Sequence, residues 1–246
     1  ETTVAVSTRF EQYDNLYFSP QLLSSYEKLK TTSNASSSLK KQKGNYFDTY
    51  LNYSLDLDRR NQSYQPTDGT RYLFIQELPV ISDTSEISNS VEISNYKTLA
   101  LEMIGKISLY ANNISSLSDK DVRISKRAYV PGKKLRGFEP GKVGPIETNN
   151  FIGGNNVVAI NLSTTLPQIL PSLESTDFSL FFDAANIWGV DYNSSIDDRS
   201  KIRSSTGLAI DVLTPVGPLN FSWAIPITKQ SSDVTETFRF NIGTTF

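Results

Sequence analysis

The chain of 246 residues contains no cysteine and no histidine. Without thiols and imidazoles, it has no thiol nucleophile, no disulfide, no imidazole base and no structural zinc site of the common kinds. The paired carboxylates Asp197 and Asp198 lie in a polar segment without a base, a nucleophile or a metal-ligand cluster in the neighbouring sequence. The sequence therefore predicts a protein that is not an enzyme, with no cofactor, no metal and no catalytic residue.

Strong charge of one sign is also missing. The 24 Lys and Arg residues nearly balance the 26 Asp and Glu residues, and the formal net charge is −2. The basic residues are scattered along the chain rather than gathered into a stripe. Because nucleic-acid binding needs a basic face, we expect no nucleic-acid partner.

No stretch of about 18 apolar residues occurs, which excludes a transmembrane helix. A transmembrane barrel is not excluded, because its lipid face needs only every second residue to be apolar. The first residues carry neither a basic nor an apolar targeting segment and already alternate like a strand. We therefore expect a fragment whose beginning is missing.

Aromatic residues, including 12 Tyr and 13 Phe, coexist with abundant Ser, Thr and Asn. Apolar and polar residues alternate with period two at the C-terminal end, where one parity holds Phe238, Phe240, Ile242 and Phe246. The same alternation predicts about ten strands of the length that a membrane barrel uses, at 3–10, 47–57, 72–78, 91–97, 99–109, 158–166, 178–185, 208–212, 219–227 and 238–246.

The connections between these segments differ in length. Short or moderate ones at one end of the strands and long polar ones at the other are typical of outer-membrane barrels. We expect the short class at 67–69, 83–86, 166–176 and 214–218, and the long class at 15–45, 113–153 and 189–201. Within the first long connection, residues 30–43 are rich in Ser, Asn and Lys and predict a mobile extracellular loop. A soluble β-sandwich or barrel also alternates, and the alternation alone does not say which face is outside.

One motif is more specific than the alternation. The longest late connection contains Leu135-Arg136-Gly137-Phe138, and Gly153-Gly154-Asn155 opens the next strand. These residues resemble the hallmark of BamA-type outer-membrane assembly factors and their relatives, which include two-partner secretion transporters and organellar sorting proteins. The resemblance covers about the last 115 positions; further matches lie at 181–188, 207–209, 214–219 and 238–246, with a looser one at 64–70.

The resemblance implies a fold and a function. The fold is all-β, an antiparallel transmembrane β-barrel of about sixteen strands, of which residues 1–246 would supply the C-terminal portion. The remaining N-terminal strands and the periplasmic POTRA repeats would precede Glu1. The implied function is assembly and insertion of β-barrel proteins into the outer membrane of a Gram-negative bacterium. The implied partners are unfolded outer-membrane proteins, outer-membrane lipid and accessory lipoproteins that bind the POTRA repeats.

The resemblance also implies roles for particular residues. In the family, the loop folds back into the barrel and its Arg meets an Asp on the inner wall, which corresponds here to Arg136 and Asp183. Parity independently places Asp183 on the polar face, and a guanidinium is a suitable bidentate partner for a carboxylate. Phe238, Phe240, Ile242 and Phe246 would form both the recognition signal and the last-strand side of a weakly paired seam with the first strand.

The sequence departs from the family pattern at two places and leaves other functions open. Ser163 stands where family members often carry a carboxylate, which removes a second partner for Arg136. Pro131-Gly132 stands where they often carry two glycines, which leaves the path of the loop open. A secretion transporter with the Arg136 loop as a plug is the alternative within the family. A passive porin is disfavoured by that loop, and a soluble β-domain is the remaining candidate.

Overall fold

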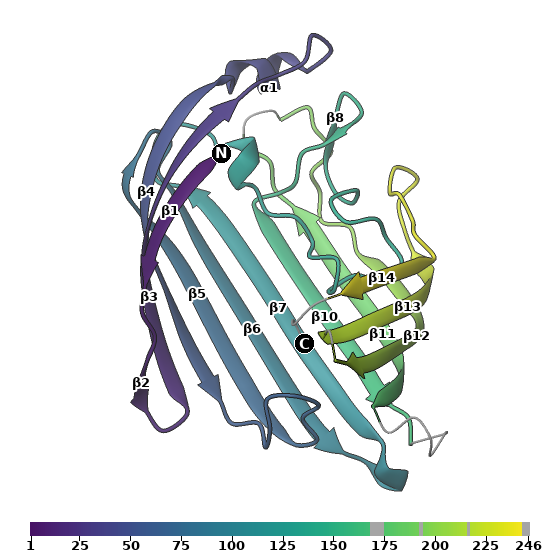
Figure 1. Ribbon diagram of the computed structural model, residues 1–246. Coiled ribbons are helices and arrows are strands. Elements are labelled where there is room, and N and C mark those ends of the chain that lie inside the picture. The colour runs from purple at the N-terminus through teal and green to yellow at the C-terminus, as the bar shows by residue number, and fades with distance from the viewer. Residues whose placement is uncertain (168–174, 192–193, 216, 243–246) are drawn as a thin grey trace.

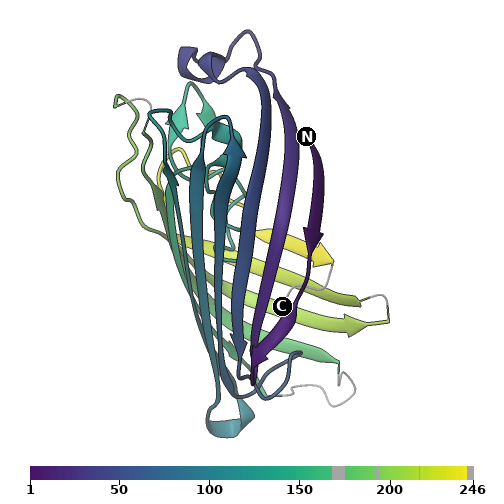
Figure 2. The same cartoon turned by 90° about the vertical axis from the view of Figure 1, so that its left-hand side faces the viewer.

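Strands of alternating apolar and polar residues pair in sequence order and build one curved antiparallel sheet (Figures 1 and 2). The computed structural model describes residues 1–167, 175–191, 194–215 and 217–242. The order across the sheet is β1, β3, β4, β5, β6, β7, β10, β11, β12, β13 and β14, and β2 pairs with β3 beside β1. The bounds are β1 Thr2–Ser7, β2 Phe10–Tyr13, β3 Leu16–Leu29, β4 Gly44–Asp58, β5 Gly69–Ser82, β6 Glu86–Thr98, β7 Ile104–Ser116, β10 Asn156–Thr165, β11 Thr176–Trp188, β12 Arg203–Thr214, β13 Gly217–Thr228 and β14 Phe238–Ile242.

Short elements lie in the connections. Helix α1 covers Ser37–Lys41, and the 3₁₀ turns η1 and η2 cover Ala100–Glu102 and Ile124–Lys126. The small hairpin of β8 (Ile146–Glu147) and β9 (Asn150–Phe151) forms a separate sheet. No helix among the described residues is long and apolar enough to cross a membrane.

The apolar parity of the strands is exposed and the polar parity is covered. Leu22, Leu51, Ile107, Leu180 and Trp223 are among the large exposed apolar residues, and they come from strands across the whole sheet. Their chain neighbours of opposite parity point inward, where Asp48, Ser108, Asp183, Ser205 and Ser222 are buried. A polar interior behind an apolar exterior is the arrangement of a barrel wall in lipid and the reverse of a soluble β-domain.

The connection between β7 and β10, residues 117–155, covers the polar face; we call it the inner loop. Its apolar residues pack with inward residues of β7, β10 and β11 into a single cluster. The first and last parts of the inner loop meet each other, because Ala128 and Gly154 exchange backbone hydrogen bonds of 2.9 and 3.0 Å. In Figure 1 this segment lies inside the curve of the sheet.

The predicted strand 3–10 is divided between β1 and β2, and the other predicted strands agree with the observed ones except at two places. The segment 15–45 was predicted to be a connection, but β3 occupies Leu16–Leu29, and only residues 30–43, which contain α1, connect it to β4. Pro20 and Ser24 interrupt the apolar parity of β3. Pro20 has no N–H to donate, and the break between β1 and β2 lies opposite it, where the amide of Thr8 donates to the Pro20 carbonyl.

The second correction concerns 99–103, which was predicted to begin a strand. These residues form a tight turn that contains η1, with the amide of Leu99 bonded to the carbonyl of Met103 at 2.7 Å. Glu102 has a φ of 62°, outside the extended region. β7 therefore starts at Ile104.

Antiparallel order fixes which connections share an end of the sheet. Residues 30–43, 117–155 and the described residues of 189–202 (189–191 and 194–202) lie at one end, as the long class was predicted to do. The turn at 83–86 was predicted among the short connections of the opposite end, and this is wrong, because β5 runs toward the end that carries the long ones. Phe246, part of the predicted terminal signal, and most of 166–176 lie outside the described residues.

Candidate functional site

Arg136 of the inner loop meets Asp183 of β11 on the inner face of the sheet. Its Nε donates to Asp183 Oδ2 at 2.8 Å and its Nη2 to Oδ1 at 2.8 Å, a bidentate pair. The backbone amide of Arg136 also donates to Oδ2, at 3.0 Å. Asp183 is 0% exposed, and an isolated buried carboxylate would be costly. The predicted contact of loop and wall is present.

Two residues of the wall shape the surroundings of this pair. The guanidinium carbon of Arg136 lies 3.4 Å from the ring centre of Phe181, two positions before Asp183 on the same strand. Asn161 of β10 donates to Asp183 Oδ1 at 2.9 Å and to the carbonyl of Lys134 at 2.8 Å. Asp183 therefore accepts four hydrogen bonds. Asn161 binds the loop just before Leu135, at the Lys134 carbonyl, and Asp183 binds it just after, at the Arg136 amide. Asn161 was not among the predicted site residues, although it pairs directly with Asp183 in the β10–β11 register.

The other motif residues are placed by close packing. Leu135 and Phe138 are almost fully buried in the apolar cluster. Gly137 has a φ of 89°, and a Cβ there would lie 3.1 Å from Ala224 Cβ and 3.2 Å from Ser205 Cβ. Ser205 donates from its hydroxyl to the Arg136 carbonyl. Only glycine at 137 lets the backbone turn this close to β12 and β13.

The inner loop also contacts the last described strand. Arg239 of β14 donates from Nη1 to the Gly132 carbonyl at 2.7 Å and from Nη2 to the Phe138 carbonyl. At Pro131-Gly132 the sequence departs from the family pattern. The path of the loop at this place is defined by the bond between Gly132 and Arg239 of β14. Arg239 lies on the polar parity of the last strand, and nothing in its spacing pointed to the loop.

Further anchors hold the start of the inner loop at the end of the sheet that carries the long connections. Arg123 is buried and pairs with Asp48 of β4, and its backbone amide donates to Glu86 at 3.2 Å. Burial alone would lower the pKa of Arg123, but Asp48 and the nearby carboxylates hold it above its ordinary value. Arg127 pairs with Asp191 of the β11–β12 connection. The sequence analysis identified neither pair, since each depends on how the loop is folded.

Asp191 has three donors from the inner loop. Besides Arg127, the backbone amide of Val122 donates to it at 3.0 Å and Asn155 at 3.2 Å. Burial alone would raise the pKa of Asp191, but these hydrogen bonds and the positive charge of Arg127 hold it below its ordinary value.

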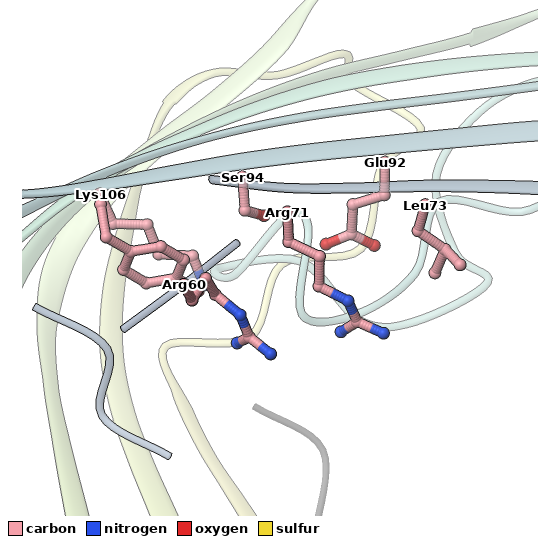
Figure 3. Close-up of a pocket in the computed structure, with 7 residues that line it drawn as sticks. Arg60, Arg71, Leu73, Glu92, Ser94 and Lys106 are labelled. Atoms are coloured by element: carbon pink, nitrogen blue, oxygen red, sulfur yellow. The ribbon is translucent and has the colours of Figure 1, made fainter. Parts of the chain in front are cut away.

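Space remains below the loop, on the inner face. A cavity of about 430 Å³ is lined by residues of both charge signs, and it includes Arg136, Asn161 and Ser163. Ser163, at the position where family members often carry a carboxylate, lines this cavity together with Arg136. A smaller pocket of about 30 Å³ adjoins it (Figure 3), lined by Arg60, Arg71, Leu73, Glu92, Ser94, Tyr96 and Lys106. That volume suits about one water molecule.

The charged groups of the small pocket are mostly committed to neighbours. Arg71 makes a bidentate pair with Asp56, at 2.8 and 2.9 Å, and Arg60 makes one with Asp58, at 2.8 and 2.7 Å. Within the described residues no group of three or more acidic side chains could hold a metal ion. The arginines of this pocket are therefore held in ion pairs with carboxylates of the wall and its connections.

The predicted terminal-strand residues lie on the outer face. Phe238 and Phe240 pack against Trp223 and Phe221 of β13, with ring centres 5.1 and 4.9 Å apart. Ile242 is exposed on the same face. These contacts place the apolar parity of β14 toward lipid and Arg239 toward the loop.

A family model described as the Omp85 superfamily domain matches residues 1–246, the whole chain. The chain belongs to the Omp85 superfamily. Among its relatives are the sorting and assembly machinery component 50 homolog of Mus musculus, 27% identical over 229 residues, and the sorting assembly machinery 50 kDa subunit of Saccharomyces cerevisiae, 26% identical over 218 residues. These alignments cover 86% and 83% of the chain, and 48% and 44% of the relatives.

A bacterial relative is the outer membrane protein assembly factor BamA of Neisseria meningitidis, 29% identical over 139 residues, or 46% of the chain and 17% of that protein. This Omp85 chain thus spans about half the length of the mouse and yeast relatives, and its alignment covers a smaller share of the Neisseria BamA.

Solved structures confirm the fold of this Omp85 chain. BamA from Haemophilus ducreyi lacking POTRA domains 1–3 superimposes with a TM-score of 0.83 at 22% identity, over 97% of this chain and 53% of that one. CdiB from Acinetobacter baumannii gives 0.58 at 13% identity, over 98% and 41%. The all-β barrel prediction is therefore confirmed, and the described sheet is part of such a barrel.

Proposed function

We propose that the protein containing this Omp85 chain assembles and inserts β-barrel proteins into an outer membrane. The observation that carries the proposal is the bidentate contact of Arg136 with the buried Asp183, which fixes the motif of the inner loop on the barrel wall. The names of the relatives from Neisseria, mouse and yeast, all of them assembly components, support the same function.

The physical device would be an edge strand that can exchange partners. β14 is the last strand in the sheet order, and its described residues Phe238 to Ile242 pair with β13. Unpaired strand edges accept further strands through their backbone hydrogen bonds. In this device an incoming strand would pair with the edge of β14.

The partners and the location belong to the same proposal. The partners are unfolded outer-membrane proteins, lipid and, through POTRA repeats elsewhere in the protein, accessory lipoproteins. The protein acts by templating and without catalytic chemistry. The outer membrane of a Gram-negative bacterium stays a prediction, because relatives come from animals and yeast as well as bacteria; fractionation of the source cells tests it.

A charge-reversal cycle in the intact protein tests the function. The variants are Arg136→Glu, Asp183→Arg and the two together, and the readout is the level of folded outer-membrane barrels. Each single change leaves a buried charge without its partner, which typically costs about 3–5 kcal/mol. We expect each single variant to deplete barrels and the double variant to restore them in part.

Other outcomes select the alternatives. Normal barrel levels with loss of one secreted protein would favour a secretion transporter, which the similarity to CdiB keeps as the second candidate. Changed uptake of small solutes alone would favour a porin. If expression of the variants is normal and none of these quantities changes, the assembly proposal is wrong.

A further inference from the structure

The connection between β13 and β14 forms a second ladder, this one with the inner loop. The amide of Glu139 donates to the Val234 carbonyl at 2.9 Å, and the amide of Val234 donates to the Lys142 carbonyl at 3.1 Å. The amide of Glu236 donates to the Gly137 carbonyl at 3.1 Å. Residues 234–236 therefore lie beside residues 137–142 of the loop and lead directly into β14.

Arg239 strengthens this junction from β14 itself. Its guanidinium reaches the carbonyls of Gly132 and Phe138, and its Nε donates to Glu236 Oε2 at 2.9 Å. The two carbonyls lie at either end of the segment that contains Arg136. Arg239 thus holds both ends of this segment, while Asp183 holds its centre.

β14 makes two sets of bonds, and both require the strand to stay in its present position. Its described backbone, Phe238 to Ile242, pairs with β13, and its Arg239 side chain binds the loop. Moving β14 away from β13 would pull Arg239 from Gly132 and Phe138. Conversely, a loop that leaves Asp183 would withdraw those two acceptors from Arg239.

We propose that Arg239 is a positioning residue that couples docking of the inner loop on Asp183 to pairing of β14 with β13. The proposal deepens the assembly function, on which its biological meaning rests: the edge would open when the loop loosens. Coupling between two equilibria is reciprocal, so a change at either site must be felt at the other.

Hydrogen exchange of the intact protein in detergent tests the coupling without any client. In Arg239→Gln, we expect backbone amides at 136–139 and at 238–242 to exchange about tenfold faster, because charge-assisted bonds to two carbonyls are lost. Arg239→Lys keeps the charge and part of the donor capacity, and should give intermediate rates. Arg199→Gln is the matched control, since Arg199 is 78% exposed and pairs only with Asp197 among its recorded ion pairs.

The reciprocal arm separates coupling from a local effect. Asp183→Asn removes the charge that holds Arg136 and does not touch β14, so faster exchange at 238–242 is expected only if the loop transmits it. Amides of β4 and β6 should keep their rates in both variants.

Two results would overturn the proposal. One is exchange in Asp183→Asn that rises at 136–139 but not at 238–242. The other is a uniform rise that includes β4 and β6, which would make Arg239 an ordinary stabilising residue. If the coupling is seen but the Arg136 and Asp183 charge cycle leaves barrel levels normal, the assembly function fails and the coupling stands.

Discussion

At the scale of single residues, Gly137 has two requirements that no other residue type meets together. Its φ of 89° disfavours any side chain, and a Cβ would be crowded by Ala224 and Ser205. We expect Gly137→Ala to lower the free energy of unfolding by about 1–3 kcal/mol, from backbone strain and overpacking combined. The measurement is the temperature at which the folded barrel converts to the unfolded form on semi-native gels.

Gly141 provides the matched control in the same loop. Its φ of 72° is also positive, but the nearest atom to a Cβ is in Tyr129, at 3.9 Å. Gly141→Ala should therefore show the backbone strain without the overpacking and cost less than Gly137→Ala. Equal losses in the two variants would show that contact with β12 and β13 does not fix the loop.

The sequence predicted the Arg136 and Asp183 pair because two independent signals met there, a motif and a strand parity. It did not predict Asn161 or Arg239. Both residues have the inward parity, but so do many other polar residues. The bonds that Asn161 and Arg239 make to the loop go to its backbone carbonyls. Every residue has a backbone carbonyl, so the sequence does not show which carbonyl accepts a bond. Only the path of the loop reveals these two contacts.

At the scale of elements, β3 shows where alternation fails as a signal. Its outward parity contains Pro20 and Ser24 beside Leu22 and Tyr26, while Leu23 faces inward. The strand is held by complete pairing with β4 on one side rather than by a clean apolar face. Strands with clear alternation, such as β11 and β13, were predicted within a few residues, because side-chain parity and pairing agree there.

The inner loop is the element whose docking should depend on pH. Asp191 accepts from Val122, Arg127 and Asn155, and its pKa lies below the ordinary value. A carboxyl group with a depressed folded pKa stabilises the fold above its unfolded pKa of about 3.9, and this contribution is lost as pH falls through the folded pKa. Docking of the loop should thus be constant near neutrality and weaken below about pH 4.

The test compares thermal unfolding of the parent and of Asp191→Asn between about pH 7 and pH 2, with the same readout. The parent should be more stable at neutral pH, and the difference should shrink as the solution becomes acidic. Asp119→Asn changes an exposed carboxylate of the same loop and should match the parent throughout. A difference that stays constant with pH would exclude the charge of Asp191 as the cause.

At the scale of the whole molecule, the face of the sheet that lies outside indicates whether the protein is surrounded by lipid or by water. Alternation is symmetric and fits a soluble core as well as a lipid face, so the sequence left a soluble β-domain open. The structure breaks this symmetry because the inner loop covers one face, and the buried Asp and Ser side chains of the strands lie on that face. The sheet curves around the loop (Figure 2), and the large apolar residues of the opposite parity are exposed.

Leu51 and Asn52 test this assignment as adjacent residues at the middle of β4. Leu51 is 41% exposed on the outer face, whereas Asn52 faces inward and bonds to Gln21. In a lipid-facing wall, Leu51→Lys should cost about 2–4 kcal/mol, the range for a cation near the bilayer midplane. Asn52→Lys should cost less, because its ammonium can reach the polar interior.

The measurement is urea-dependent folding of the intact protein into lipid vesicles, compared with the same protein in detergent. A soluble β-domain would tolerate Leu51→Lys on its exposed surface, so equal folding of both variants into vesicles would reject the membrane wall.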